Sequence, residues 1–174
     1  MKRSFWIGII CAVCYLGNIP LSSAVQTASI GSTFSCTFLD SGDQGFFDSS
    51  STHTWNQSQI DAAIRALSTW DSLINSTPGR TLTVGLTWYD GSNSSTLASA
   101  YSPYFYHQSN GPQQVATLAE SVWRDGSTKA DTGYDIYIQC NTAYLNSLYC
   151  ETALSPEYTG KYDFQSILTH EVGH

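Results

Sequence analysis

The sequence predicts an α+β domain, and three observations favour that class. Apolar residues recur at steps of three and four between residues 56 and 75, which is the spacing of an amphipathic helix. Residues 80–90 and 134–141 instead alternate apolar and polar side chains, as half-buried strands do. Together with the segments between them, the predicted order is helix, strand, edge strand, helix, strand and helix, which is typical of an α+β fold.

The length and composition indicate one globular domain rather than a disordered or nucleic-acid-binding chain. The 174 residues suit a single domain, and hydrophobic residues make up 41% of them. Charged residues make up only 12% and aromatic residues 13%, which argues against long disordered segments. The formal charge of −7 lacks the basic footprint that phosphate binding needs, so no nucleic-acid partner is expected.

The N-terminal 24 residues have the pattern of a secretory signal peptide. Lys2 and Arg3 precede an apolar stretch at 5–16, and polar and small residues follow as far as Ala24. The apolar stretch of about 12 residues is shorter than the ~20 that a membrane-spanning helix needs. We therefore expect residues 1–24 to be removed, leaving a secreted or periplasmic protein without a stable membrane span; a retained anchor is the alternative.

Three cysteines remain after the predicted cleavage, and an odd number in an exported chain leaves at least one unpaired within it. Cys140 and Cys150 are close in sequence and could close a small disulfide loop. Cys36 would then have no partner in the chain.

The first elements of the predicted mature chain follow from local composition. Residues 25–53 are rich in Ser, Thr, Gly and Asp and predict an irregular or short-stranded entry segment. In the helix predicted over 56–75 one apolar stripe is formed by Ile60, Ala63, Ile64, Leu67, Trp70 and Ile74. The candidate N-caps are Thr54, Asn56 and Ser58. Pro78-Gly79 is expected to end this helix.

The middle of the chain predicts two strands, an edge segment and a second helix. Residues 80–90 form the first strand, and a turn follows it. Residues 97–107 contain Pro103, which restricts any strand there to a sheet edge. Residues 113–123 place apolar side chains at helical spacing, and 134–141 return to strand alternation. A Tyr-rich connection then leads to Asp163, the expected N-cap of a last helix that begins at Phe164.

The last five residues, His170 to His174, form the pattern HExxH. Two histidines four positions apart on a helix lie on one face, one turn apart. Both imidazoles can then reach one Zn²⁺ ion, and Glu171 can accept a proton from a water molecule held beside them. A chance HExxH in a chain of this length has a probability of ~0.5%. The alternative is a buried helix whose histidines and glutamate only solvate its end.

The glycine in this motif is unfavourable inside a helix. Gly173 costs about 1 kcal/mol relative to alanine at such a position. Close packing of another backbone over position 173 would account for a glycine there.

Residues 163–174 resemble the active-site helix of secreted zincin metalloproteases, whose form is D-F-x-[ST]-[VI]-x-x-H-E-[IV]-G-H. The predicted helix 56–75, the strand TLTVGLTW, the segment LASAYSP and the strand YDIYIQCN also follow an order similar to that of a group of bacterial secreted HExxH proteins. The resemblance implies a zincin-like fold, with a twisted mixed sheet backed by an amphipathic helix and an active-site helix at the C-terminus.

The resemblance also implies a function and a site. It indicates a zinc-dependent metalloendopeptidase acting on protein or peptide substrates, with Zn²⁺ held by His170 and His174 and with Glu171 as general base. An edge strand within 97–107 would pair with the substrate backbone. The residues expected at this substrate edge are Ala98, Ser99, Ala100 and Tyr101.

One feature departs from the zincin pattern. Catalytic zinc sites use three protein ligands, and in HExxH proteins the third normally lies downstream of the motif. We therefore expect residues 25–174 to be the N-terminal part of an incomplete zincin-like domain, and this polypeptide to bind zinc weakly and hydrolyse peptides poorly. The last four carbonyls of a helix have no partners within it, so we also expect the last turn of this helix to fray, which would weaken zinc binding. His53 and His107 are upstream alternatives that the family pattern does not support.

A cluster of aromatic residues is compatible with a second class of function. Tyr101, Tyr104, Phe105 and Tyr106 could form an aromatic surface. The chain would then be a secreted non-catalytic binding or adhesive domain.

Overall fold

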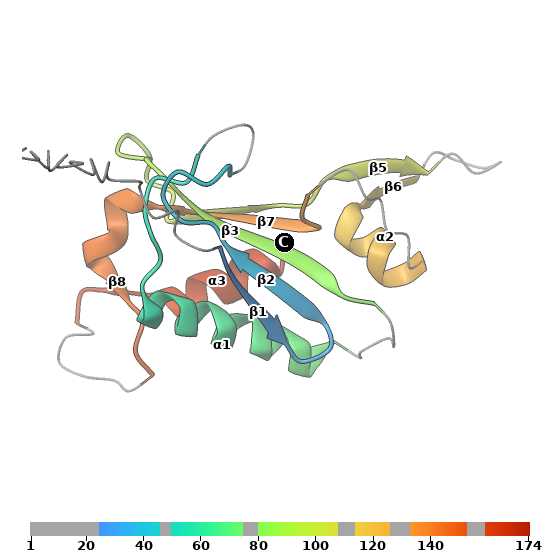
Figure 1. The fold of residues 1–174 in the computed structure, drawn as a ribbon, viewed down its shortest axis with the longest axis horizontal. Coiled ribbons are helices and arrows are strands. Elements are labelled where there is room, and N and C mark those ends of the chain that lie inside the picture. The colour runs from blue at the N-terminus through green and yellow to red at the C-terminus, as the bar shows by residue number, and fades with distance from the viewer. Residues whose placement is uncertain (1–24, 46–49, 75–79, 108–113, 126–132, 153–158) are drawn as a thin grey trace, which may run out of the picture.

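The computed structural model describes residues 25–45, 50–74, 80–107, 114–125, 133–152 and 159–174 (Figure 1). The predicted signal peptide, residues 1–24, lies outside them. The described chain is α+β, as predicted, with a mixed sheet and three α-helices. In chain order the elements are β1 (Gln26–Ile30), β2 (Phe34–Phe38), α1 (Gln57–Leu73), β3 (Leu82–Tyr89), β4 (Ala98–Tyr101), β5 (Tyr104–His107), β6 (Gln114–Thr117), α2 (Leu118–Asp125), β7 (Ile136–Asn141), the 3-10 helix η2 (Thr142–Ser147), β8 (Leu148–Tyr149), β9 (Tyr162–Asp163) and α3 (Phe164–Val172).

The main sheet has five strands in the order β1-β2-β3-β7-β4. The inner pairs β2–β3 and β3–β7 are parallel, and the outer strands β1 and β4 run antiparallel to their neighbours. The predicted entry segment thus contains two regular strands, joined by a tight turn at Gly31, whose φ of 55° favours glycine. Among the described residues, β4 forms one edge of this sheet.

Helix α1 confirms the predicted amphipathic helix and selects Asn56 from the three candidate caps. The Asn56 side chain accepts from the Gln59 N–H at 3.0 Å, and the Gln59 side chain accepts from the Asn56 N–H at 3.0 Å. This reciprocal pair is a capping box. The helix ends at Leu73, several residues before the expected stop at Pro78-Gly79, which lies outside the described residues.

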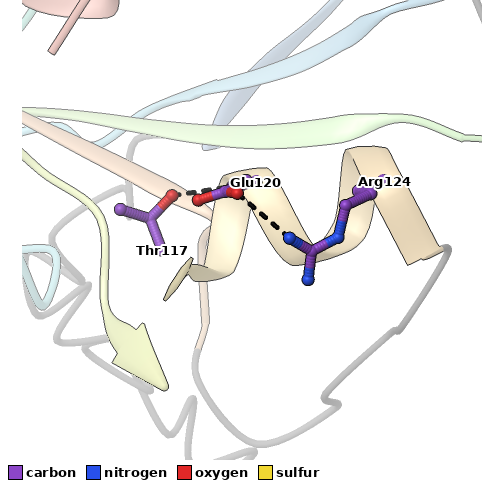
Figure 2. Close-up of polar contacts among 3 residues, drawn as sticks. All are labelled: Thr117, Glu120 and Arg124. Carbon is purple, nitrogen blue, oxygen red and sulfur yellow. Dashed lines mark hydrogen bonds and ion pairs between the residues drawn. The ribbon is translucent and has the colours of Figure 1, made fainter. Parts of the chain in front are cut away.

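The helix predicted over 113–123 begins too early. Residues Gln114–Thr117 form β6, which pairs antiparallel with β5, and α2 starts only at Leu118. The Thr117 hydroxyl accepts from the Glu120 N–H at 3.1 Å, so Thr117 caps the helix, and an exposed Glu120–Arg124 ion pair at 3.2 Å follows one turn later (Figure 2). The apolar spacing was compatible with a helix, but the neighbouring strand supplies backbone partners that override it.

Helices α1 and α3 lie side by side on the same face of the sheet (Figure 1). α1 packs against β1 and β2, and α3 packs against β7 and β4. Between helices and sheet lies an aromatic cluster of Trp55, Trp88 and Phe164, whose exposed fractions are 4%, 1% and 1%. The rings of Trp88 and Phe164 stack at 5.7 Å between centroids. This cluster fixes the start of α3 against the sheet.

None of the helices found in the described segments is long and apolar enough to cross a membrane.

Candidate functional site

The helix that carries the HExxH motif is anchored at its start by a cap and by α1. Asp163 caps α3 as predicted, because its side chain accepts from the Gln165 N–H at 3.2 Å. Arg65 of α1 donates to the Gln165 side chain at 3.0 Å and also to the carbonyl of Cys150. Arg65 therefore links α1, α3 and the residue that follows β8, a role that no motif in the sequence indicated.

The two histidines of the motif converge in space. Both side chains are exposed, and their Nε2 atoms lie 3.0 Å apart, with the hydrogen-bond donor set by the tautomers. The ring centroids of His170 and His174 are 4.6 Å apart and the rings are nearly perpendicular. The helix thus presents two imidazole nitrogens to a common point at its surface.

Glu171 lies beside this pair on the inner side of the helix. The residue is 9% exposed, and no hydrogen bond or ion pair to its carboxylate is found among the described residues. A buried acid without a partner is costly, which is why most buried acids are paired. Its carboxylate opens instead onto two hollows in the surface.

These hollows run between α3 and the edge strand β4. One cavity of about 550 Å³ is lined by residues 98–102 together with Thr117, Ala119, Ile136, Glu171, Val172 and His174. A second, of about 470 Å³, is lined by Ser95, Leu97, Ala98, Ser166, Ile167, His170 and Glu171. Glu171 and Ala98 line both. The residues predicted as a substrate edge thus face the same hollows as the motif residues.

The backbone of β4 directs alternate polar groups away from β7, along the open edge of the main sheet. The Asn141 N–H donates to the Leu97 carbonyl at 3.0 Å, so Leu97 and the alternate residues Ser99 and Tyr101 point their backbone groups at β7. The N–H and C=O groups of Ala98 and Ala100 therefore point away from the sheet. An extended peptide could pair with them by adding a strand.

Among the residues that the structure describes, no third metal ligand is found next to the two histidines. Within the described ranges, no group of three His, Cys, Asp or Glu side chains could hold one ion. His53 packs edge-on against the Trp88 ring at 5.5 Å instead. The side chain of His107 is outside the described part of the structure, as are those of Tyr104, Phe105 and Tyr106, so the predicted aromatic surface stays a prediction.

Cys36, Cys140 and Cys150 are all free thiols in the structure. No bond joins Cys140 to Cys150, and the predicted disulfide remains a prediction. Burial raises the pKa of Cys36, and burial together with Glu171 and Cys150 raises the pKa of Cys140. Burial and Glu151 raise the pKa of Cys150 to about 11, although Arg65 opposes the shift.

Alkylation of the native protein should therefore be slow and ordered. At pH 8 we expect Cys150 to react with iodoacetamide at least about tenfold more slowly than in urea, because only the thiolate reacts. Cys36 and Cys140 should react later still, and mass spectrometry of the labelled peptides gives the order. Early labelling of Cys140 would contradict the burial. If both Cys140 and Cys150 resist alkylation in urea and react only after reduction, a disulfide joins them.

Comparison of the chain with known protein families, with curated proteins and with solved structures finds no match.

Proposed function

We propose that this chain carries the HExxH part of a zinc-dependent metalloendopeptidase with a zincin-like fold, exported from the cell. The observation that supports it most is the convergence of two exposed imidazoles at 3.0 Å beside Glu171, whose carboxylate has no hydrogen-bond or ion-pair partner found among the described residues. The same glutamate lines hollows whose other wall is an open strand edge.

The two imidazoles fit a zinc ion. Zn–N bonds are about 2.0–2.1 Å long, so two nitrogens at tetrahedral angles round one ion lie about 3.3 Å apart. The observed 3.0 Å is close to that separation before any adjustment. A bound Zn²⁺ would lower the pKa of a water molecule to about 7 and polarise a substrate carbonyl.

Each residue around the proposed metal has a separate role in the reaction. His170 and His174 would hold the metal, and Glu171 would accept the proton of the attacking water and pass it to the leaving amine. The Glu171 side chain lies beside β4, where its carboxylate opens onto the hollows that Ala98 also lines. Ala98 and Ala100 would pair with the substrate backbone and so orient the scissile bond toward Glu171.

Zinc titration tests the metal site. We expect His170→Ala to weaken Zn²⁺ binding by at least about a hundredfold, because one of two converging ligands is lost. Isothermal calorimetry with the 174-residue chain measures it, with His53→Gln as the matched control, since His53 packs on Trp88. Equal affinities for the native chain and His170→Ala would refute the site.

Hydrolysis tests the reaction itself. The protein expressed from its complete gene should cleave labelled casein, lose that activity to a chelator and regain it with Zn²⁺. A zinc-binding protein that leaves casein and peptide libraries intact would instead favour a non-catalytic binding domain.

A further inference from the structure

A side chain from another helix donates a hydrogen bond to the C-terminal end of α3. The last four carbonyls of an α-helix have no partner inside it, and in α3 they belong to residues 169–172. The indole N–H of Trp70, on α1, donates to the Thr169 carbonyl at 2.7 Å. The N–H groups of Gly173 and His174 close the next two carbonyls by bonds of 3.0 and 3.2 Å. These three bonds satisfy carbonyls of the last turn, the turn for which the sequence predicts fraying.

The same indole explains the glycine of the motif. A Cβ added at Gly173 would lie 2.8 Å from Cζ2 and 3.4 Å from Cη2 of Trp70. The φ of −77° is ordinary for a helix, so glycine is needed there for space and not for its conformational freedom. A rigid side chain, held by its own hydrogen bond, thus takes the place of the packed backbone that the sequence suggested.

These two contacts lie next to the two imidazole-bearing residues. Thr169 precedes His170, and Gly173 precedes His174. Trp70 and both histidines also line a common hollow of about 560 Å³ between α1 and α3. We propose that Trp70 is a positioning residue, which sets the separation of the His170 and His174 nitrogens by fixing the backbone on either side. This role rests on the proposed zinc function.

A double-mutant cycle tests the proposal. Trp70→Phe removes the N–H donor and the outer indole atoms, and we expect Zn²⁺ affinity to fall about five- to tenfold. Gly173→Ala alone forces a methyl group against the indole and should lower affinity at least about tenfold. In the Trp70→Phe background the clash with the indole is relieved and only the His170 carbonyl, at 3.2 Å, stays close, so Gly173→Ala should change affinity less than about threefold there.

The readout is the Zn²⁺ affinity of the full chain by calorimetry, with thermal unfolding as a check on global stability. Trp123→Phe, at a half-buried tryptophan on α2, is the matched control and should leave affinity unchanged. Loss of affinity with an unchanged melting temperature, together with the non-additive cycle, supports positioning. Additive effects, or native affinity in Trp70→Phe, would overturn it.

The failure of this proposal is distinguishable from that of the zinc site. If His170→Ala abolishes binding while the Trp70 and Gly173 variants bind normally, the zinc site stands and the positioning role is refuted. If His170→Ala binds like the native chain, the proposed function fails. The role of Trp70 in ordering the backbone is then decided by Cα chemical shifts of residues 169–174 in the zinc-free protein, which should lose helical character in Trp70→Phe; unchanged shifts would overturn it.

Discussion

Replacing Glu171 with glutamine should lower peptide hydrolysis by about 10²–10⁴-fold, since general acid–base catalysis contributes a factor of that size. Glutamine has nearly the same shape but cannot accept a proton. Because no hydrogen bond or ion pair to the Glu171 carboxylate is found among the described residues, the substitution breaks no such bond and removes only the charge that acts on Cys140. The turnover rate on a fluorogenic peptide, with the protein expressed from its complete gene, measures the effect.

Two comparisons make this result specific. Zn²⁺ affinity should stay within about threefold of the native value, because Glu171 lies beside the proposed ligands and is not one of them. Glu120→Gln, which breaks only the exposed pair with Arg124 on α2, should keep full activity (Figure 2). More than a tenth of native activity in Glu171→Gln would rule out this residue as the general base.

Truncation of Phe164 to alanine should lower the free energy of unfolding by about 3–5 kcal/mol. Phe164 is 1% exposed, begins α3 and stacks on Trp88 at 5.7 Å and on Trp55 at 6.3 Å. Its removal leaves a cavity between helix and sheet where the orientation of α3 is set. We expect Zn²⁺ affinity to fall as well, because the helix that carries both histidines loses its anchor. Urea unfolding followed by fluorescence measures the stability change.

The matched control for this truncation is Leu73→Ala. Leu73 is also a large apolar residue of a helix, but it is 69% exposed, so its loss should change stability by no more than about 0.5 kcal/mol. A loss below about 1 kcal/mol in Phe164→Ala would show that the aromatic cluster does not hold α3.

Local patterns predicted most of the individual elements. The stripe from Ile60 to Ile74 predicted α1, because burial on one helix face imposes a period that the sequence displays. Alternation from Leu82 to Trp88 predicted β3 as a strand, but its half-burial was wrong. Gly85 and Thr87 on the other face are buried as well, and the Tyr134 ring packs over Gly85. The same reasoning failed over 114–117, where apolar spacing fits a helix. Pairing with β5 there depends on a neighbour that the local pattern does not contain.

The sequence by itself determined the chemistry available to this protein: two histidines one helical turn apart, with a glutamate between them, since that arrangement needs only the geometry of a single helix. Only the tertiary structure decided what surrounds them. The edge strand beside Glu171, the Arg65 anchor on Gln165 and the indole over Gly173 come from residues 70 to 103 positions away from the residues that they contact. Such contacts arise when α1 and β4 pack against α3, and no periodicity within α3 records them.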